Sequence, residues 1–187
     1  MKIKSNALPI ELSSPFYDKN KTFCSTFEHY IASKNGKVKG IYNAYSYLVY
    51  GKIINPKPWN LIYKKSTFTS TGNLLLSSES QSLLVLAEWK TELKGTYTSE
   101  VKIRKRKRLD SFILHFNKSL SILDITDKYI IYSKGESIRV LKSIIEILKP
   151  LFVSGEIYKV ELINEKLNIE LRSKQHHFDI LDKLLVL

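Results

Sequence analysis

The sequence predicts an α+β protein with a mainly antiparallel sheet and a C-terminal β-α-β-β-α lobe. Two observations lead to this expectation. In several short stretches apolar residues alternate with polar ones, which is the period of a half-buried strand. Near the C-terminus the alternating period is replaced by the three-to-four-residue spacing of an amphipathic helix. The alternation then returns, and a second stretch with helical spacing follows it. Strands and helices in this order favour a sheet that carries its helices on one face.

Length and composition limit the fold further. The chain has 187 residues, of which 43% are hydrophobic, so it can form one well-packed domain or two small lobes that share a core. Cys24 is the single cysteine, so neither an intramolecular disulfide nor a CxxC metal site is expected. No stretch reaches the roughly 20 apolar residues that cross a bilayer. We therefore expect a cytoplasmic protein without a transmembrane segment.

Residues 1–120 are expected to form a basic, tyrosine-rich and mostly β region whose first ~35 residues are irregular, apart from a short helix within "TFEHYIASK". After it, tyrosine, valine and isoleucine predict a hairpin or meander over residues 37–54, with turns at its glycines. "NPKPWN" ends this segment, because proline donates no amide hydrogen bond. Further strands are expected over residues 61–71, 73–78 and 83–93.

A hairpin is predicted in the middle of the chain, where Gly95 can adopt the positive φ of a tight turn. With a two-residue loop at Lys94-Gly95, Trp89 would pair with Glu100 across the ladder. "DSFILHF", residues 110–116, is then expected as a third strand. The basic residues of "EVKIRKRKRLDS" would lie at the end of one strand and in the connection to the next.

Residues 121–187 give the clearest pattern, and we expect them to share one continuous core with residues 1–120. "KYIIYS" predicts a strand, and an apolar helix should follow it until Pro150 and Gly155 end it. Alternation on both sides of Asn164-Glu165 predicts a hairpin. "FDILDKLLVL" closes the lobe as a second amphipathic helix.

The stretches "YIIYSKGESIRVLKSIIEILKPL" and "KLNIELRSKQHHFD", together with "FILHFNKSL", cover much of residues 84–180. They resemble the C-terminal part of an uncharacterised bacterial family to which automatic annotation attaches the label "galanin". The resemblance implies the same succession of strand, apolar helix and hairpin. This sequence lacks the membrane-spanning segments that such proteins often carry upstream. The resemblance implies no activity and no catalytic residues.

Charge gives the main indication of function. The net charge is +12, with 30 Lys and Arg against 18 Asp and Glu. Most of these cations are lysines, which an AT-rich coding sequence explains equally well, but three of the five arginines lie within residues 100–111. We expect a non-enzymatic binding or assembly domain that contacts an acidic partner through this stretch. The basic run consists of Lys102, Arg104, Lys105, Arg106, Lys107 and Arg108.

Nucleic acid is the alternative partner, because the same cations can contact phosphate. Exposed aromatic side chains could then stack on bases. The candidates for stacking are Tyr42, Tyr45, Tyr47, Tyr50 and Trp59. No known nucleic-acid-binding motif is matched. An anionic membrane surface, which would use the cations against lipid head groups, is a third and less favoured partner.

A metal-dependent nuclease is a less favoured alternative. In Glu88-x-Lys90 and Glu100-x-Lys102 a strand would place a carboxylate and an amine on one face, and Glu79 is the nearest further acidic residue. The carboxylate and amine of such pairs also arise on any solvated strand. We therefore expect no catalytic residues.

Other catalytic patterns are equally weak. His176, His177, Asp179 and Asp182 could gather near a metal, but an acidic first helical turn accounts for the same residues. Cys24 is surrounded by no nucleophile signature, and we expect it to be inert. With only seven glycines and no phosphate-binding motif, nucleotide-dependent chemistry is disfavoured. No metal or cofactor is expected.

Overall fold

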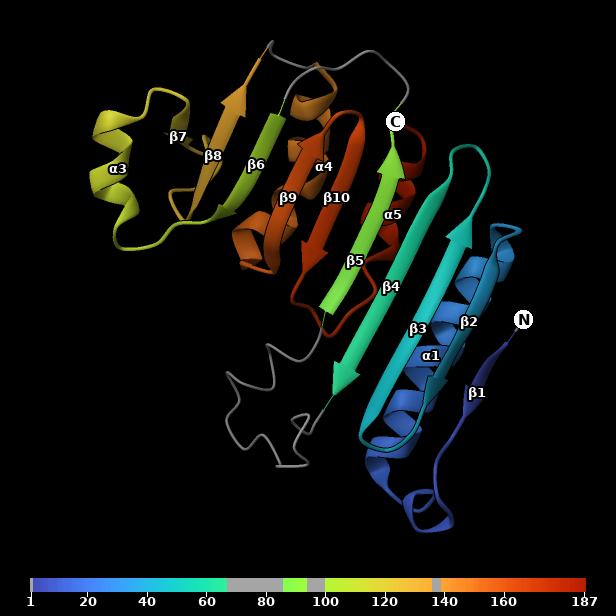
Figure 1. The fold of residues 1–187 in the computed structure, drawn as a ribbon. Coiled ribbons are helices and arrows are strands. Elements are labelled where there is room, and N and C mark those ends of the chain that lie inside the picture. Colours follow the sequence, from blue (N-terminus) through green and yellow to red (C-terminus); the bar gives the residue numbers. More distant parts are fainter. Residues whose placement is uncertain (1, 67–85, 94–99, 136–138) are drawn as a thin grey trace. The chain divides into compact units, whose positions relative to one another are not determined.

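The computed structural model describes residues 2–66, 86–93, 100–135 and 139–187 (Figure 1). These residues form helices and a mostly antiparallel set of strands, which confirms the predicted α+β class. Contacts divide the chain into two compact units, and each is described by itself. Unit 1 contains residues 1–89 and 172–176, and unit 2 contains residues 90–171 and 177–187.

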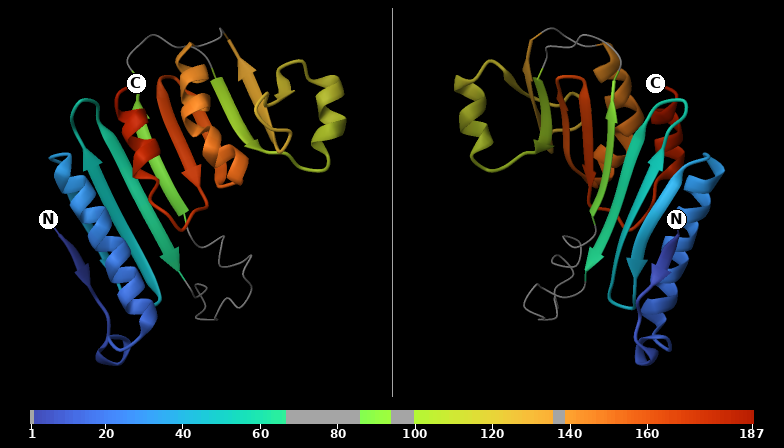
Figure 2. Two further views of the ribbon diagram at one scale, coloured as in Figure 1. Left: turned by 180° about the vertical axis from the view of Figure 1, so that it is seen from behind. Right: turned by 45° about the vertical axis from the view of Figure 1, so that its right-hand side comes forward.

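Unit 1 carries one long helix on a small sheet. The strand order is β1-β2-β3-β4, with β1 parallel to β2 and the other neighbours antiparallel. Figure 2 shows the helix α1 lying along one face of these strands. The elements are β1 (Ile3–Ser5), the 3-10 helix η1 (Pro9–Glu11), α1 (Pro15–Ser33), β2 (Lys37–Tyr42), β3 (Ser46–Ile53) and β4 (Trp59–Ser66).

Helix α1 contains the short helix expected within "TFEHYIASK", but it begins eleven residues earlier, at Pro15, and so corrects the expectation of an irregular segment there. Its start is set by Ser14, whose hydroxyl accepts the Phe16 amide at 3.3 Å, and by Pro15 in the first helical turn. The helical pattern is hard to see in the sequence because polar or small residues share the buried stripe with Phe27. One of them, Asn20, donates to the carbonyl of Asn43 at 2.8 Å. The stripe consists of Tyr17, Asn20, Cys24, Phe27 and Ile31.

The hairpin of β2 and β3 forms where tyrosine, valine and isoleucine predicted it, and its turn follows Asn43, whose side chain accepts the Ser46 amide at 2.8 Å. Gly40 and Gly51, predicted as turn residues, lie instead inside β2 and β3. A Cβ at Gly51 would come within 2.7 Å of the Phe27 ring. Glycine at this position therefore allows α1 to approach the strand closely.

Unit 2 has the strand order β10-β9-β6-β8-β7. Figure 2 shows α4 lying across one face of these strands, and α5 packs beside α4. The strand β5 (Leu86–Glu92) crosses the boundary between the units. The other elements are β6 (Glu100–Lys105), α3 (Asp110–Phe116), β7 (Leu120–Ile122), β8 (Tyr129–Lys134), α4 (Arg139–Ser154), β9 (Ile157–Ile163), β10 (Lys166–Leu171) and α5 (Phe178–Leu185).

The predicted hairpin between residues 83–93 and 100–105 is wrong. Strand β6 pairs along one edge with β8 and along the other with β9, both antiparallel. A strand has only two edges, so no edge of β6 remains for β5. The expected turn at Lys94-Gly95 lies outside the described residues, as does the strand expected over 73–78.

The strand expected over residues 110–116 is also wrong, because these residues form the helix α3. Their apolar residues fit a helical face as well as an alternating strand, and short apolar stretches are ambiguous in this way. Asp110 decides between the two, since its carboxylate accepts the amide of Lys107 and the guanidinium of Arg104 at the start of the helix. An acidic residue in the first turn also suits the helix dipole.

The C-terminal lobe forms as predicted, with β8, α4, β9, β10 and α5 in that order. The turn between β9 and β10 uses Asn164 and Glu165, both at positive φ. Helix α4 does not end at Pro150 but continues to Ser154, because Leu151 and Phe152 are buried and hold its last turn. Gly155, at φ +79°, then ends it.

The first boundary between the two units follows Trp89. Residues 100–122 join the C-terminal lobe because β6 is a central strand of that sheet. None of the helices formed by the described residues is long and apolar enough to cross a membrane.

Candidate binding surface at the end of strand β6

The basic run does not form one continuous row of free cations. Lys102 lies within β6, and its Nζ is 2.7 Å from Oε1 of Glu100 on the same face of the strand. This hydrogen bond lowers the pKa of Glu100 and raises that of Lys102. The alternation of side chains along the strand buries Val101 and Ile103 on the opposite face. Lys102 thus neutralises a neighbouring carboxylate.

Arg104 is also engaged within the protein. Its guanidinium donates from Nη1 and Nη2 to the two carboxylate oxygens of Asp110, both at 2.7 Å, in a bidentate pair. Asp110 is 2% exposed and accepts the backbone amide of Lys107 as well. The hydrogen bonds from Arg104 hold the pKa of Asp110 at about 2. Arg104 therefore ties the end of β6 to the start of α3.

Arg106 forms further hydrogen bonds that hold the loop between β6 and α3. Its Nη2 donates to the hydroxyl of Ser111 at 2.7 Å, and its amide donates to the carbonyl of Lys128 at 2.8 Å. Together with the Arg104–Asp110 pair, these bonds fix the loop between β6 and α3. The loop cations are consequently presented from a defined backbone.

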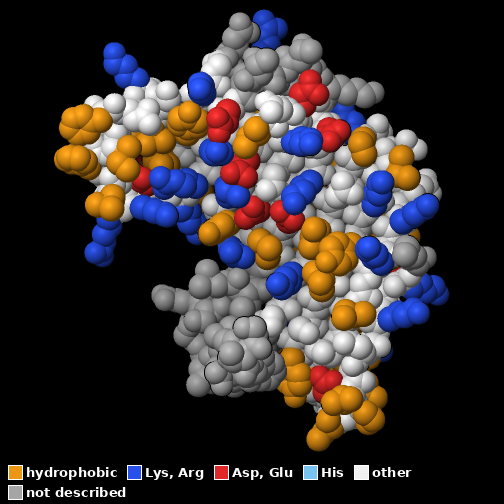
Figure 3. Space-filling view, viewed as in Figure 1, with side chains coloured by type: hydrophobic (Ala, Val, Ile, Leu, Met, Phe, Trp, Pro, Cys, Tyr) orange, Lys and Arg blue, Asp and Glu red, His pale blue; other side chains and the backbone are white. Residues whose placement is uncertain are grey.

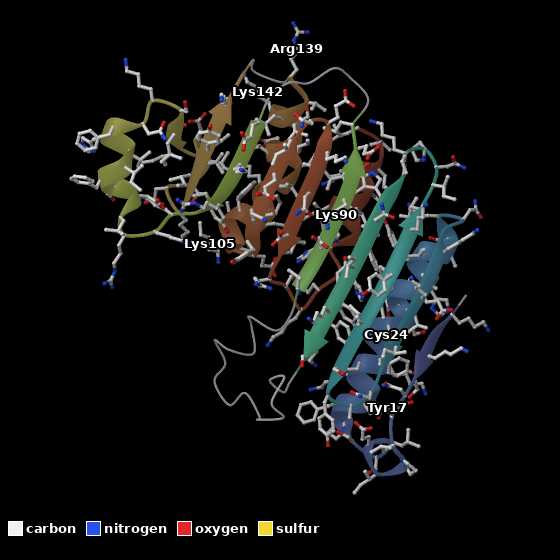
Figure 4. The ribbon with its side chains drawn as sticks, viewed as in Figure 1. Tyr17, Cys24, Lys90, Lys105, Arg139 and Lys142 are labelled. Atoms are coloured by element: carbon white, nitrogen blue, oxygen red, sulfur yellow. The ribbon has the colours of Figure 1, made fainter. Side chains whose placement is uncertain are left out.

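Three cations of the run project into solvent. Lys105, Lys107 and Arg108 are exposed, and no hydrogen bond or ion pair of their side-chain nitrogens is found among the described residues. Figure 4 shows Lys105 at the end of α4 that lies away from Arg139 and Lys142. These three cations are therefore the part of the run that can meet a partner without breaking an existing pair.

An open pocket of about 600 Å³ lies beside these cations. Its walls come from the β6–α3 loop, from the residues before β8 and from the C-terminal end of α4. A Cβ added at Gly155 would lie 3.9 Å from Nζ of Lys105, so the absence of a side chain leaves room next to this ammonium. The lining residues are Lys105, Arg106, Lys107, Arg108, Ser111, Asp127, Lys128, Tyr129, Ser154 and Gly155.

The pocket is strongly cationic, since five of its lining side chains are basic and one, Asp127, is acidic. The negative end of the α4 dipole offsets part of this charge near Lys105. Clustered cations in a concave surface raise the local positive potential and attract anionic groups. Chemically, the arrangement can bind carboxylates or phosphates.

Sequence reasoning missed the part of this pocket that lies outside the basic run. Lys128, Asp127 and Ser154 are far from residues 105–108 in the chain, and the pairing of β6 with β8 brings the first two close. Ser111 was expected on a strand. No local pattern marks these residues, because their proximity arises from sheet pairing and from the position of α4.

The aromatic residues considered for base stacking are mostly packed inside unit 1. Tyr47 and Trp59 are 4% and 1% exposed, and Tyr47 stacks on Phe23 with 4.6 Å between ring centroids. Tyr45 is exposed but precedes β3, so it does not share a strand face with Tyr47. Tyr50 lies beneath the ammonium of Lys39. These residues do not form one open stacking surface.

The histidine and cysteine candidates have structural surroundings. His176 stacks on Phe23 at 3.8 Å between centroids, whereas Nε2 of His177 is 3.0 Å from Glu156. The two histidines belong to different units. Cys24 is buried, and burial raises the pKa of its thiol to about 12, so it is protonated at neutral pH.

The Glu-x-Lys candidates give no clear metal site. The carboxylate of Glu100 pairs with Lys102, and Glu79 lies outside the described residues. Within the described ranges, no group of three or more His, Cys, Asp and Glu residues is placed to hold a metal ion. Glu88 and Lys90 lie on β5, half-buried and exposed respectively.

No protein-family model matches the chain, and no curated protein is significantly similar to it in sequence. The resemblance to the galanin-labelled family stays a prediction.

Proposed function

We propose that this protein is a non-catalytic binding module whose cationic pocket, at the end of β6 in unit 2, contacts an acidic partner protein. The observation that carries the proposal is that some cations of the basic run pair with acidic residues of the protein, whereas others are exposed to solvent. Lys102 and Arg104 pair with acidic residues of the chain itself. Lys105, Lys107 and Arg108 are left exposed around an open pocket.

The proposal is supported by how this loop is built. Flexible surface lysines lose conformational freedom when they bind, which weakens their contribution. Here the backbone of the loop is already fixed by the Arg104–Asp110 pair and by the Arg106 amide. A fixed backbone leaves only the side chains to be ordered on binding, so a carboxylate gains more from meeting these cations.

The test measures binding of fluorescent poly-glutamate and of mixed-sequence single- and double-stranded oligonucleotides by anisotropy, at about 50 mM and about 200 mM salt. The test variant combines Lys105→Ser, Lys107→Ser and Arg108→Ser. The control variant removes the same charges from α4 by Lys142→Ser, Lys149→Ser and Arg139→Ser. We expect poly-glutamate to bind the unchanged protein and the control variant, and to bind the test variant at least about tenfold more weakly.

Three outcomes decide the proposal. Equal losses in the test and control variants would show that only net charge matters, and would overturn the assignment of the pocket. If only the oligonucleotides bind, and this binding is lost in the test variant, the pocket would be assigned to nucleic-acid binding instead. Cleavage of an oligonucleotide with Mg²⁺ or Mn²⁺, lost on Glu88→Gln or Glu100→Gln, would overturn the non-catalytic role.

A further inference from the structure

An exposed apolar face lies directly beside the cationic pocket. Leu109, Phe112 and Phe116 are 77%, 71% and 76% exposed, and Ile113 is 42% exposed. Their spacing of i, i+3, i+4 and i+7 places all four on one side of α3 and its preceding residue. The rings of Phe112 and Phe116 lie 5.2 Å apart between centroids. Contiguous apolar patches of this kind mark interaction surfaces.

The fold does not depend on these side chains for its core. Asp110 is the one buried residue of α3, and it is held by Arg104 and by the amide of Lys107. Figure 1 shows α3 at the outer edge of unit 2, beyond β7 and β8. This clamp, formed by Arg104, Asp110 and the Lys107 amide, anchors α3 without its apolar side chains. The apolar face of α3 is therefore available to bind another molecule.

The cations and the apolar face adjoin along the chain. Arg108, which lines the pocket, directly precedes Leu109, the first residue of the apolar face. Figure 3 shows hydrophobic side chains gathered over α3, with Lys and Arg side chains next to them. A partner that covers both must offer apolar side chains and carboxylates side by side.

We propose that the pocket and the apolar face of α3 together bind an amphipathic acidic helix of a partner protein, whose carboxylates enter the pocket while its leucine-like side chains cover the two phenylalanines. This inference rests on the proposed function and specifies its partner. The apolar residues have the i, i+3, i+4, i+7 spacing by which helices recognise one another. The five cations of the pocket complement the acidic side of such a helix.

The shape of the surface favours a protein segment over the other anionic partners. A lipid bilayer presents a plane, which can touch the exposed side of α3 but cannot follow the surface into a pocket whose far wall includes Ser154 at the end of α4. Nucleic acid would use the phenylalanines for stacking but leave the aliphatic side chains of Leu109 and Ile113 uncovered. An amphipathic acidic helix can contact both the cationic pocket and the apolar face of α3.

The experiment uses the full-length protein and three synthetic probes. A Glu/Leu peptide of about 18 residues carries Leu at i, i+3, i+4 and i+7 and Glu at most other positions. A Glu/Ser peptide has the same charge, with Ser in place of Leu. Vesicles of phosphatidylcholine with phosphatidylglycerol represent an anionic membrane. Anisotropy measures peptide binding, and co-sedimentation measures vesicle binding.

The test variant is Phe112→Gln with Phe116→Gln, because glutamine keeps helix propensity and removes the rings. The control is Val186→Gln, which replaces an apolar side chain that is 80% exposed elsewhere in unit 2. We expect the Glu/Leu peptide to bind about tenfold more tightly than the Glu/Ser peptide. The test variant should lose this preference yet bind the Glu/Ser peptide unchanged, and the control should behave like the original protein.

The remaining outcomes separate this inference from the proposed function. Equal binding of both peptides to the unchanged protein would sink the inference and leave the cationic pocket as an acidic-partner site. Binding of neither peptide would overturn both. A Glu/Leu preference that survives in the test variant, or phenylalanine-dependent binding to vesicles without such a preference, would assign the apolar face of α3 to another role and overturn the inference.

Discussion

Replacing Asp110 with asparagine tests the structural basis of the binding surface. The side chain of Asp110 accepts two hydrogen bonds from Arg104 and one from the amide of Lys107, while only 2% of it is exposed. Asparagine has nearly the same size but no charge and a single acceptor oxygen. The variant should therefore weaken the bidentate pair and leave the guanidinium of Arg104 without its counterion.

The size of the effect follows from the pKa of Asp110. Its fall from 3.8 to about 2 corresponds to an upper limit of about 2.5 kcal/mol, at about 1.4 kcal/mol per pH unit. Because the Arg104 side chain is 40% exposed, water screens the pair, and we expect a loss of about 1–2 kcal/mol in the free energy of unfolding. Arg104→Lys keeps the positive charge but cannot form the bidentate pair, so it should lower the free energy of unfolding by about 1 kcal/mol.

Urea unfolding at several pH values measures this loss. The folded-state pKa of Asp110 is depressed, so its stabilisation is complete above the unfolded value of 3.8 and disappears as the pH falls through about 2. The difference between the original protein and Asp110→Asn should thus be largest near neutral pH and shrink in acid. Asp124→Asn, at an exposed carboxylate, is the control. Equal stability of the two variants at neutral pH would refute the clamp.

Two further predictions concern unit 1. Gly51→Ala should lower the free energy of unfolding by about 1–3 kcal/mol, because its Cβ would come within 2.7 Å of Phe27; an unchanged thermal midpoint would show that α1 can shift. Tyr63→Phe should lose about 1–3 kcal/mol, since the buried hydroxyl accepts from Nε1 of Trp89 at 3.0 Å and donates to the carbonyl of His176 at 2.7 Å. Denaturant titration against Tyr50→Phe measures this, and equal losses in both variants would contradict the network.

The C-terminal lobe could be predicted because its local patterns and its tertiary environment agree. Alternating residues on either side of Asn164-Glu165 form β9 and β10, and their inner residues are buried. The helical stripe of Leu141, Ile144 and Leu148 is likewise buried. Where period, turn residues and burial point the same way, one short segment determines its own structure.

The middle of the chain could not be predicted in the same way. Gly95 favoured a hairpin between neighbouring strands, yet β6 pairs with β8 and β9, which follow it much later in the chain. Strand pairing is decided by which edges are filled across the whole sheet, and a single turn residue carries little of that information. Residues 110–116 were ambiguous for a related reason, since seven residues are too few to distinguish the two periods.

The sequence by itself determined that the protein is α+β, that its C-terminal lobe has the order β-α-β-β-α, and that its arginines concentrate at residues 104–108. These properties depend on composition and local period. Only the tertiary structure decided that Arg104 closes a clamp on Asp110, that Lys105, Lys107 and Arg108 stay exposed, and that Lys128 joins them around a pocket. The reason is physical, because an ion pair or a pocket depends on distances between segments that the sheet brings together.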